Sequence, residues 1–266
     1  MSYMKQLLVA VCLWSLFVSF SIAWAQTSHL EFEVASIKPT PPDWGRGRFA
    51  TMQGAHQFVA RNYTLKYMVA AAYSVTLRTI SGGPSWIDSD PYDILAATPG
   101  EVRPSFDDQM LMLRALLADR FQLAFHTEQK EFSIYALTAA KNGVKLKESA
   151  AAPDEQPMLI NRVFPGDFIQ LPARNATMAQ FAAMLQRAVL DRPVLDRTAL
   201  TGRYDFDLEW TPDETQFDGR MPPLKAENSG KPDLFAAVQQ LGLRLESTKG
   251  PVPVIVIDHV ERPSEN

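Results

Sequence analysis

Residues able to do acid–base chemistry are few in this sequence and stand far apart. The four histidines are His29, His56, His126 and His259, and no two have the spacing of a metal-ligand pair. Asp258 directly precedes His259 and would suit an oriented base, yet no nucleophile can be nominated beside the pair. The motifs of zinc peptidases, serine hydrolases and phosphate-binding loops do not occur in the sequence. The sequence therefore predicts no catalytic residue, no metal site and no cofactor.

Three carboxylates form the only acidic row of interest. Asp205, Asp207 and Glu209 alternate with apolar residues, so a strand would present all three on one face. Calcium prefers oxygen ligands of this kind. However, side chains two residues apart on a strand lie about 7 Å apart, and one straight row cannot enclose an ion. A solvated strand face is the better interpretation.

The glycine-rich loop at residues 82–86, with the sequence Gly-Gly-Pro-Ser-Trp, is the best candidate for a binding site. A tryptophan behind a glycine turn can stack on a sugar ring or on a proline of a bound peptide. The alternative is that the indole covers the end of a hydrophobic core, which is the commoner role of such a residue. We therefore predict Gly82, Gly83 and Trp86 as ligand-binding residues, with the structural alternative left open.

Residues 1–25 have the pattern of a secretory signal peptide. A lysine precedes the apolar run of residues 7–22, and Ala23 and Ala25 are the small residues expected before cleavage at Gln26. The apolar run is shorter than the roughly 20 residues that cross a bilayer, so an uncleaved anchor is the less favoured alternative. The expected location is the periplasm or the outside of a bacterial cell.

The composition is that of a globular protein with enough material for a core. The chain has 266 residues, of which 46% are hydrophobic and 21% charged. Cys12 is the only cysteine and lies in the signal segment, so the mature chain would have no disulfide and no thiol nucleophile. The net charge of −4 argues against nucleic acid as a partner, because such binding depends on clustered lysine and arginine. A membrane is expected to be contacted only through the signal peptide before cleavage.

Two stretches of the sequence share a short motif. Residues 60–65 read Ala-Arg-Asn-Tyr-Thr-Leu and residues 173–178 read Ala-Arg-Asn-Ala-Thr-Met. Each opens an apolar stripe with helical spacing and is followed by a Tyr-Asp word, at residues 92–93 and 204–205. The two copies keep their internal spacing within one residue. Such a duplication indicates two related structural units.

The pattern in each copy predicts a hairpin, a helix, a strand, a second helix and two closing strands. In the first copy the closing strands are expected at residues 121–125 and 132–140, joined by the polar residues 127–131. In the second copy they are expected at residues 243–246 and 252–260. The predicted fold class is α+β, with two pseudo-repeated lobes packed through antiparallel or mixed sheets. The predicted boundaries are a first lobe at 26–147, a linker at 148–157 and a second lobe at 158–266.

Several blocks of the sequence together resemble a known family. They are residues 32–39 (FEVASIKP), the glycine loop with Trp86, residues 116–121 (LLADRF), residues 204–206 (YDF) and the ending at 261–266 (ERPSEN). The family is that of exported soil-bacterial proteins known as domain of unknown function 3738, which is abundant in acidobacteria. Similar domains occur fused behind membrane zinc peptidases of the β-lactam-sensor type, whose zinc motif is missing from this sequence. The resemblance implies no activity and no catalytic residue.

A second and weaker similarity concerns the helix, strand, helix and two-strand unit. It looks like the short N-terminal domains of secretins and TonB-dependent receptors, which bind partners in the periplasm. The sequence thus favours a non-catalytic cell-envelope module that binds an envelope protein, a peptide or a glycan. A secreted hydrolase of peptidase or esterase type is the alternative, and a pocket gathering His, Asp and Ser side chains would favour it. A scaffolding role is a third option, for which a large exposed apolar patch would be the sign.

Overall fold

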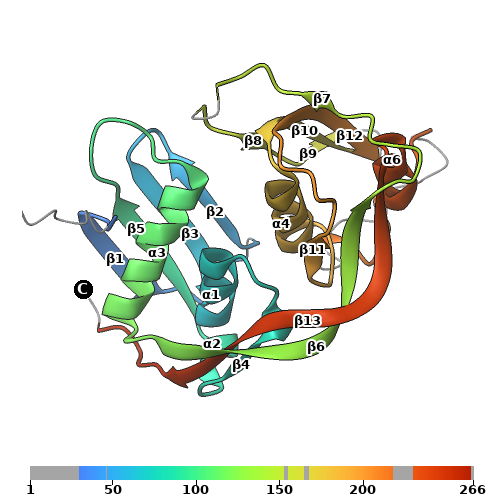
Figure 1. Ribbon diagram of the computed structural model, residues 1–266. Helices are drawn as coiled ribbons and strands as arrows, with labels where there is room; N and C mark the ends of the chain where they lie inside the picture. Colours follow the sequence, from blue (N-terminus) through green and yellow to red (C-terminus); the bar gives the residue numbers. More distant parts are fainter. Residues whose placement is uncertain (1–29, 46, 153–154, 165–167, 218–229, 265–266) are drawn as a thin grey trace, which may run out of the picture.

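The computed structural model describes residues 30–45, 47–152, 155–164, 168–217 and 230–264. The predicted signal peptide and part of the predicted linker lie outside the described residues, so the cleavage site stays a prediction. None of the helices in the described ranges is long and apolar enough to cross a membrane. The fold is α+β, as the sequence predicted, with two lobes joined by a long two-stranded ribbon (Figure 1).

The first lobe consists of one antiparallel sheet with helices on one of its faces (Figure 1). Its strands lie in the order β1-β5-β3-β2. Leu65, Met68, Val69 and Ala72 form the buried stripe of the first helix, as their helical spacing predicted. The elements are β1 (Val34–Pro39), β2 (Phe49–Gln53), β3 (Gln57–Thr64), α1 (Leu65–Tyr73), β5 (Pro91–Ala97) and α3 (Phe106–Arg120).

The second lobe is built on another antiparallel sheet, in which β10 and β12 are the central pair. Met178, Phe181, Ala182 and Leu185 are buried and join the helix that follows β10 to the core. The elements are β7 (Lys147–Glu148), β8 (Met158–Leu159), β9 (Arg162–Phe164), β10 (Phe168–Ala176), α4 (Met178–Ala188), β12 (Tyr204–Trp210) and α6 (Leu234–Gln240).

The ribbon consists of β6 (Ala124–Ala139) and β13 (Leu243–His259), which pair antiparallel along their length. Each end of the ribbon takes on one short parallel strand, and the connections to the first lobe are a 3₁₀ turn and a short helix. Ile255 and Ile257 of β13 belong to the core of the first lobe, and Tyr135 and Leu137 of β6 to that of the second. The additional elements are η1 (Leu77–Thr79), β4 (Ile80–Gly82), α2 (Trp86–Ser89) and β11 (Val194–Asp196).

The prediction of two separate closing strands in each copy is wrong. Residues 127–131, expected to form a turn, lie within β6 and pair with residues 251–255 of β13. Their side chains are exposed, although Val252 and Val254 on the paired segment of β13 are buried. A strand whose backbone is satisfied by its partner needs no apolar alternation there, so the polar run was misinterpreted. The predicted division at 148–157 stays a prediction about sequence units, since each core draws strand residues from across it.

The two Ala-Arg-Asn segments, residues 60–62 and 173–175, have the same local geometry. The strand register shifts between Ala60 and Tyr63 in β3, and between Ala173 and Ala176 in β10. The asparagine of each segment is left-handed, with φ of 59° and 51°, a conformation that asparagine tolerates better than most residues. Repetition of the whole lobe stays a prediction, while at these segments the two copies agree.

Candidate functional site

The two glycines of the predicted binding loop have packing roles. Gly82 pairs with Ile257 at the end of β4, and both glycines have positive φ, 77° and 75°. A Cβ atom on Gly82 would lie 2.6 Å from the backbone oxygen of Ile257, and one on Gly83 would lie 3.0 Å from Ile87 Cδ1. Only glycine allows this approach of the loop to the ribbon.

Trp86 opens α2 and is half-buried against the core of the first lobe. The guanidinium carbon of Arg262 lies 5.0 Å from the centre of the indole, and an Arg262 nitrogen lies 2.5 Å from an Asp90 carboxylate oxygen. The ring therefore already has a core on one side and a cation nearby. Ligand binding at Gly82, Gly83 and Trp86 stays a prediction, and the packing gives the structural alternative a definite basis.

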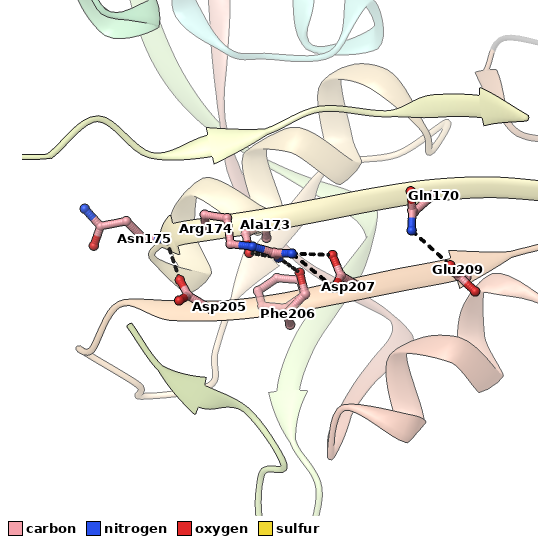
Figure 2. Close-up of polar contacts among 8 residues, drawn as sticks. All are labelled: Gln170, Ala173, Arg174, Asn175, Asp205, Phe206, Asp207 and Glu209. Atoms are coloured by element: carbon pink, nitrogen blue, oxygen red, sulfur yellow. Dashed lines mark hydrogen bonds and ion pairs between the residues drawn. The ribbon is translucent and has the colours of Figure 1, made fainter. Parts of the chain in front are cut away.

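Each carboxylate of the acidic row on β12 has a partner on β10 (Figure 2). The row is thus a face of paired charges and hydrogen bonds. Among the residues that the structure describes, no three His, Cys, Asp or Glu side chains are grouped so as to hold a metal ion. The Asn175 backbone amide donates to Asp205 at 2.9 Å. Arg174 donates to the two Asp207 oxygens at 2.9 and 3.2 Å, and the Gln170 side chain donates to Glu209 at 3.0 Å.

The partner of Asp258 is His126 on the neighbouring strand, and the sequence interpretation that paired it with His259 is wrong. The Nδ1 atom of His126 lies 2.8 and 3.0 Å from the two Asp258 oxygens. Consecutive strand residues point to opposite faces, so residues adjacent in sequence are poorly placed to pair. The second ring nitrogen of His126 faces Glu128 at 3.4 Å, where a hydrolase would place a hydroxyl or thiol.

A cavity of about 790 Å³ lies between the two lobes, and we name it the inter-lobe cleft. Its volume is within the range of about 300–1,000 Å³ that is typical of ligand sites. One wall comes from the first lobe, around α1 and the segment after it, and the other from the end of α4 and the residues that follow. The residues used below are Arg48, Tyr63, Tyr67, Ala71 and Arg78 on the first wall and Arg187, Leu190 and Asp191 on the second.

A hydrogen bond between the lobes closes one side of the cleft. Gln186 Nε2 donates to the backbone oxygen of Ser74 at 2.6 Å, and its Oε1 accepts from the Val194 amide at 3.0 Å. Ser74 ends α1 in the left-handed conformation, which turns its carbonyl away from the helix ladder. Gln186 also lines a second cavity of about 290 Å³, so this contact stands between two openings of the same interface.

Arginine and tyrosine side chains are grouped on the first wall. The guanidinium carbon of Arg48 lies 3.3 Å from the ring centre of Tyr67 and 5.2 Å from that of Tyr63. The two tyrosine rings meet edge to face, with 6.5 Å between their centres. Arg48 thus covers one aromatic face and places its charge at the cleft.

Arg187 brings a second cation from the opposite wall. Its guanidinium carbon lies 4.2 Å from the ring centre of Phe106, and no carboxylate of the described residues lies within 4.0 Å of its nitrogens. Burial lowers the pKa of Arg187 below its ordinary value, although the Asp107 carboxylate and Tyr63 act in the opposite direction. The cleft therefore holds an exposed arginine that makes no close ion pair with the described residues.

Sequence reasoning did not identify these cleft residues. Tyr63 stands in a repeated word, but the arginines at 48, 78 and 187 have no common motif and no regular spacing. They converge only because the ribbon sets α1 against α4. No sequence signal marks such a site, since cations scattered along a chain are ordinarily solvated surface residues.

Comparison with known proteins identifies a family and no individual relative. The family described as "Protein of unknown function (DUF3738)" matches residues 66–260. No curated protein and no solved structure matches the chain.

Proposed function

This chain belongs to the DUF3738 family of proteins of unknown function, and we propose that it is a non-catalytic cell-envelope module that binds its ligand in the inter-lobe cleft. The ligand classes are those expected from the sequence, an envelope protein, a peptide or a glycan. The single observation that carries the proposal is a cavity of about 790 Å³ lined by side chains of both lobes. A ligand bound in this cavity would contact side chains of both lobes at once.

The residue types in the cleft support recognition more than reaction. Of its described lining residues, Asp191 is the one acid, and histidine is not among them. Arginine, tyrosine and apolar side chains bind ligands through charge, hydrogen bonds and contact area. A hydrolytic site would instead need a base held beside a nucleophile. The His126–Asp258 contact lies on the ribbon, and a contact of His259 with Glu261 lies at the end of β13, both away from this lining.

The test uses two alanines that both lie on helices. Ala71 on α1 lines the cleft, whereas Ala118 on α3 is exposed elsewhere. Peptide and glycan arrays are probed with the chain from Gln26 onward, and each ligand found is titrated against Ala71→Trp and Ala118→Trp. We expect the indole at position 71 to fill the cleft and weaken binding at least about tenfold, while Ala118→Trp binds like the wild type. Equal affinities for all three proteins would contradict binding in the cleft.

A secreted hydrolase is the second candidate, and the His126–Asp258 contact is the observation that favours it. The carboxylate orients the imidazole at 2.8 Å, as in many catalytic pairs. The expected outcome under the binding proposal is that ester and peptide panels are not turned over. Turnover that a His126→Ala variant loses, with unchanged folding by circular dichroism, would favour the hydrolase.

Export from a bacterial cell, with a soil bacterium as the expected source, is part of the same proposal. The support is the signal-peptide pattern of residues 1–25 in the sequence. The mature chain is expected to begin at Gln26, which intact-mass measurement of periplasmic and secreted fractions would detect. A species that keeps residues 1–25 would indicate an anchored protein instead.

A further inference from the structure

We propose that the ligand of the inter-lobe cleft is an acidic peptide segment, whose carboxylates bind Arg78 and Arg187 while its apolar side chains lie against the cleft walls. This inference rests on the proposed binding function and specifies its ligand. The two cations come from opposite lobes, since Arg78 follows α1 and Arg187 lies in the last turn of α4. A carboxylate-bearing ligand would therefore join the two lobes by charge.

Arg187 has a structural role as well, and in that role none of the described carboxylates lies within 4.0 Å of its guanidinium nitrogens. Near the end of α4 it interacts favourably with the helix dipole, and its guanidinium packs on Phe106. It also donates a hydrogen bond at 3.2 Å to Met184 Sδ, a weak acceptor. This is the one hydrogen bond that the Arg187 side chain makes with the residues the structure describes, and a planar guanidinium can bind a carboxylate in bidentate fashion.

Arg78 is held only loosely. Its nearest carboxylate oxygen, on Asp191, lies 4.0 Å away, and 69% of the Arg78 side chain is exposed. Asp191 also lies 3.4 Å from Arg192, so its charge is shared with a cation that is not among the lining residues. An incoming carboxylate can thus reach Arg78 without breaking a tight ion pair.

The walls favour a peptide over a sugar acid. Arg48 lies 3.3 Å from the ring centre of Tyr67, on the aromatic face where a sugar would stack. Both walls also contribute apolar side chains, with Ala70, Ala71 and Val75 on one side and Leu190 on the other. Alternating acidic and apolar side chains match such a surface, whereas the hydroxyl groups of a sugar would lose hydrogen bonds to water there.

The net charge of the whole chain affects how an acidic ligand would be attracted. Its net charge of −4 repels acidic ligands in general, so attraction to an acidic peptide must come from a local cationic site. The probes are a fluorescein-labelled decapeptide of alternating glutamate and leucine, the same peptide with glutamine or lysine for glutamate, and an oligogalacturonate. Binding of each probe to the chain from Gln26 onward is followed by fluorescence anisotropy or, for the unlabelled glycan, by calorimetry.

Two cleft variants and one matched control are compared. Arg78→Gln and Arg187→Gln, alone and together, remove the cleft charges, and Arg244→Gln removes an exposed arginine of β13 that pairs with Glu246. We expect the glutamate peptide to bind best, the double variant to bind it at least about tenfold more weakly, and the control to be unchanged. Raising the salt concentration from about 50 to about 500 mM should weaken wild-type binding and leave the double variant nearly unaffected. Circular dichroism checks that Arg187→Gln is folded. If that variant does not fold, Arg78→Gln alone tests the proposal, because Arg78 is exposed.

The outcomes separate this inference from the function on which it rests. Binding of the glutamine or lysine peptide, with no preference for glutamate, would overturn the acidic ligand and keep the binding module. Binding of the oligogalacturonate in place of the peptides would overturn it in favour of a glycan. Equal affinities of the double variant and the control would place the peptide outside the cleft and overturn it as well. If no ligand binds here or on the arrays, the proposed function itself fails.

Discussion

The Ala-Arg-Asn segments of the two lobes have the same backbone but start their helices differently. In the second lobe Thr177 caps α4, and Gln180 completes a capping box. In the first lobe Thr64 stands at the same place before α1, yet its side chain makes no capping hydrogen bond. Three residues on, the first lobe has Tyr67 where the second has Gln180, and a tyrosine cannot return the second bond of the box.

The helix that lacks the capping box, α1, is the helix whose Tyr67 lines the cleft. Tyr67 lies under Arg48 and forms part of the first wall, whereas Gln180 serves only its own helix. Natural sequences tend to break local structural rules where function requires it. At the first wall of the cleft, Tyr67 thus packs against Arg48 at the position where the second lobe has a capping glutamine.

Asp93 and Asp205 accept hydrogen bonds from the backbone amides of Asn62 and Asn175, respectively, and the two aspartates differ in burial. Asp93 is 7% exposed and accepts from Thr40 at 2.8 Å, Arg61 at 2.7 Å and the Asn62 amide at 3.0 Å. Burial alone raises the pKa of Asp93, and these three donors outweigh it, so that the pKa lies below its usual value. Asp205 is half-exposed, and the Asn175 amide is the main cause of its lowered pKa.

The largest expected effect tests this difference. Asp93→Ala should lower the free energy of unfolding by about 2–3 kcal/mol, because it removes the buried acceptor of Arg61, of the Asn62 backbone amide and of the Thr40 hydroxyl. Asp205→Ala should lower it by only about 1 kcal/mol, since Asp205 is less buried than Asp93 and its main hydrogen bond is the one from the Asn175 backbone amide. Urea unfolding at neutral pH measures both. Equal destabilisation by the two variants would show that burial does not distinguish the two sites.

The second prediction concerns the helix caps. Thr177→Val should cost about 1 kcal/mol, because the Gln180 amide loses its acceptor. Thr64→Val should cost less than about 0.5 kcal/mol or be slightly stabilising, since the buried Thr64 hydroxyl has no hydrogen-bond partner to lose. Thermal and urea unfolding of the two variants are compared directly. A destabilisation at Thr64 as large as that at Thr177 would mean that both threonines cap in solution.

Local patterns predicted much of the fold, because helix stripes and capping words depend on residues close in sequence. The buried residues of α1 and α4 and the capping box at Thr177 follow directly from spacing. The continuous ribbon could not be predicted this way. In β6 the polar residues 127–131 are all exposed and show no apolar alternation, although Val252 and Val254 opposite them on β13 are buried.

The candidate site was less accessible to sequence reasoning than the fold. The glycine loop drew attention because glycine and tryptophan are unusual together, and its glycines prove necessary for packing against Ile257. The cleft arginines belong to different elements and become neighbours only through tertiary structure. A search for catalytic spacing does not detect a site of this kind, because charge complementarity requires no fixed sequence interval.

The third prediction exchanges the residues at the matching helix positions of the two lobes, Tyr67 in α1 and Gln180 in α4. Tyr67→Gln should leave the free energy of unfolding within about 0.5 kcal/mol of the wild type, because a new capping bond with Thr64 offsets the removal of the cation–π interaction with Arg48. Binding of the acidic peptide should nevertheless fall severalfold, since Arg48 loses the ring that positions it. Gln180→Tyr is the matched control, and it should destabilise by about 0.5–1 kcal/mol without changing affinity. Unchanged binding by Tyr67→Gln would remove the link between the missing cap and the cleft.

The smallest expected effect distinguishes the two ends of the ribbon by their response to pH. His126 on β6 faces Asp258 on β13 at the first-lobe end of the ribbon, whereas Leu137 and Leu245, which pair at the other end, do not titrate. The hydrogen bond that His126 donates to Asp258, followed by that to Glu128, raises the pKa of His126 above its ordinary value near 6.5. A raised pKa in the folded state means that the contribution to stability is complete below the ordinary value and is lost as pH rises through the raised one.

The wild type should therefore be slightly less stable at about pH 9 than at about pH 6, by less than the effect of Thr177→Val, because both partners are exposed to solvent. Asp258→Asn removes the main cause of the raised pKa, and His126→Gln removes the titrating group. Both variants should flatten the dependence when the urea midpoint is followed across this range. A slope that survives in both would have to come from groups away from this end of the ribbon, and the pH response would then no longer distinguish its two ends.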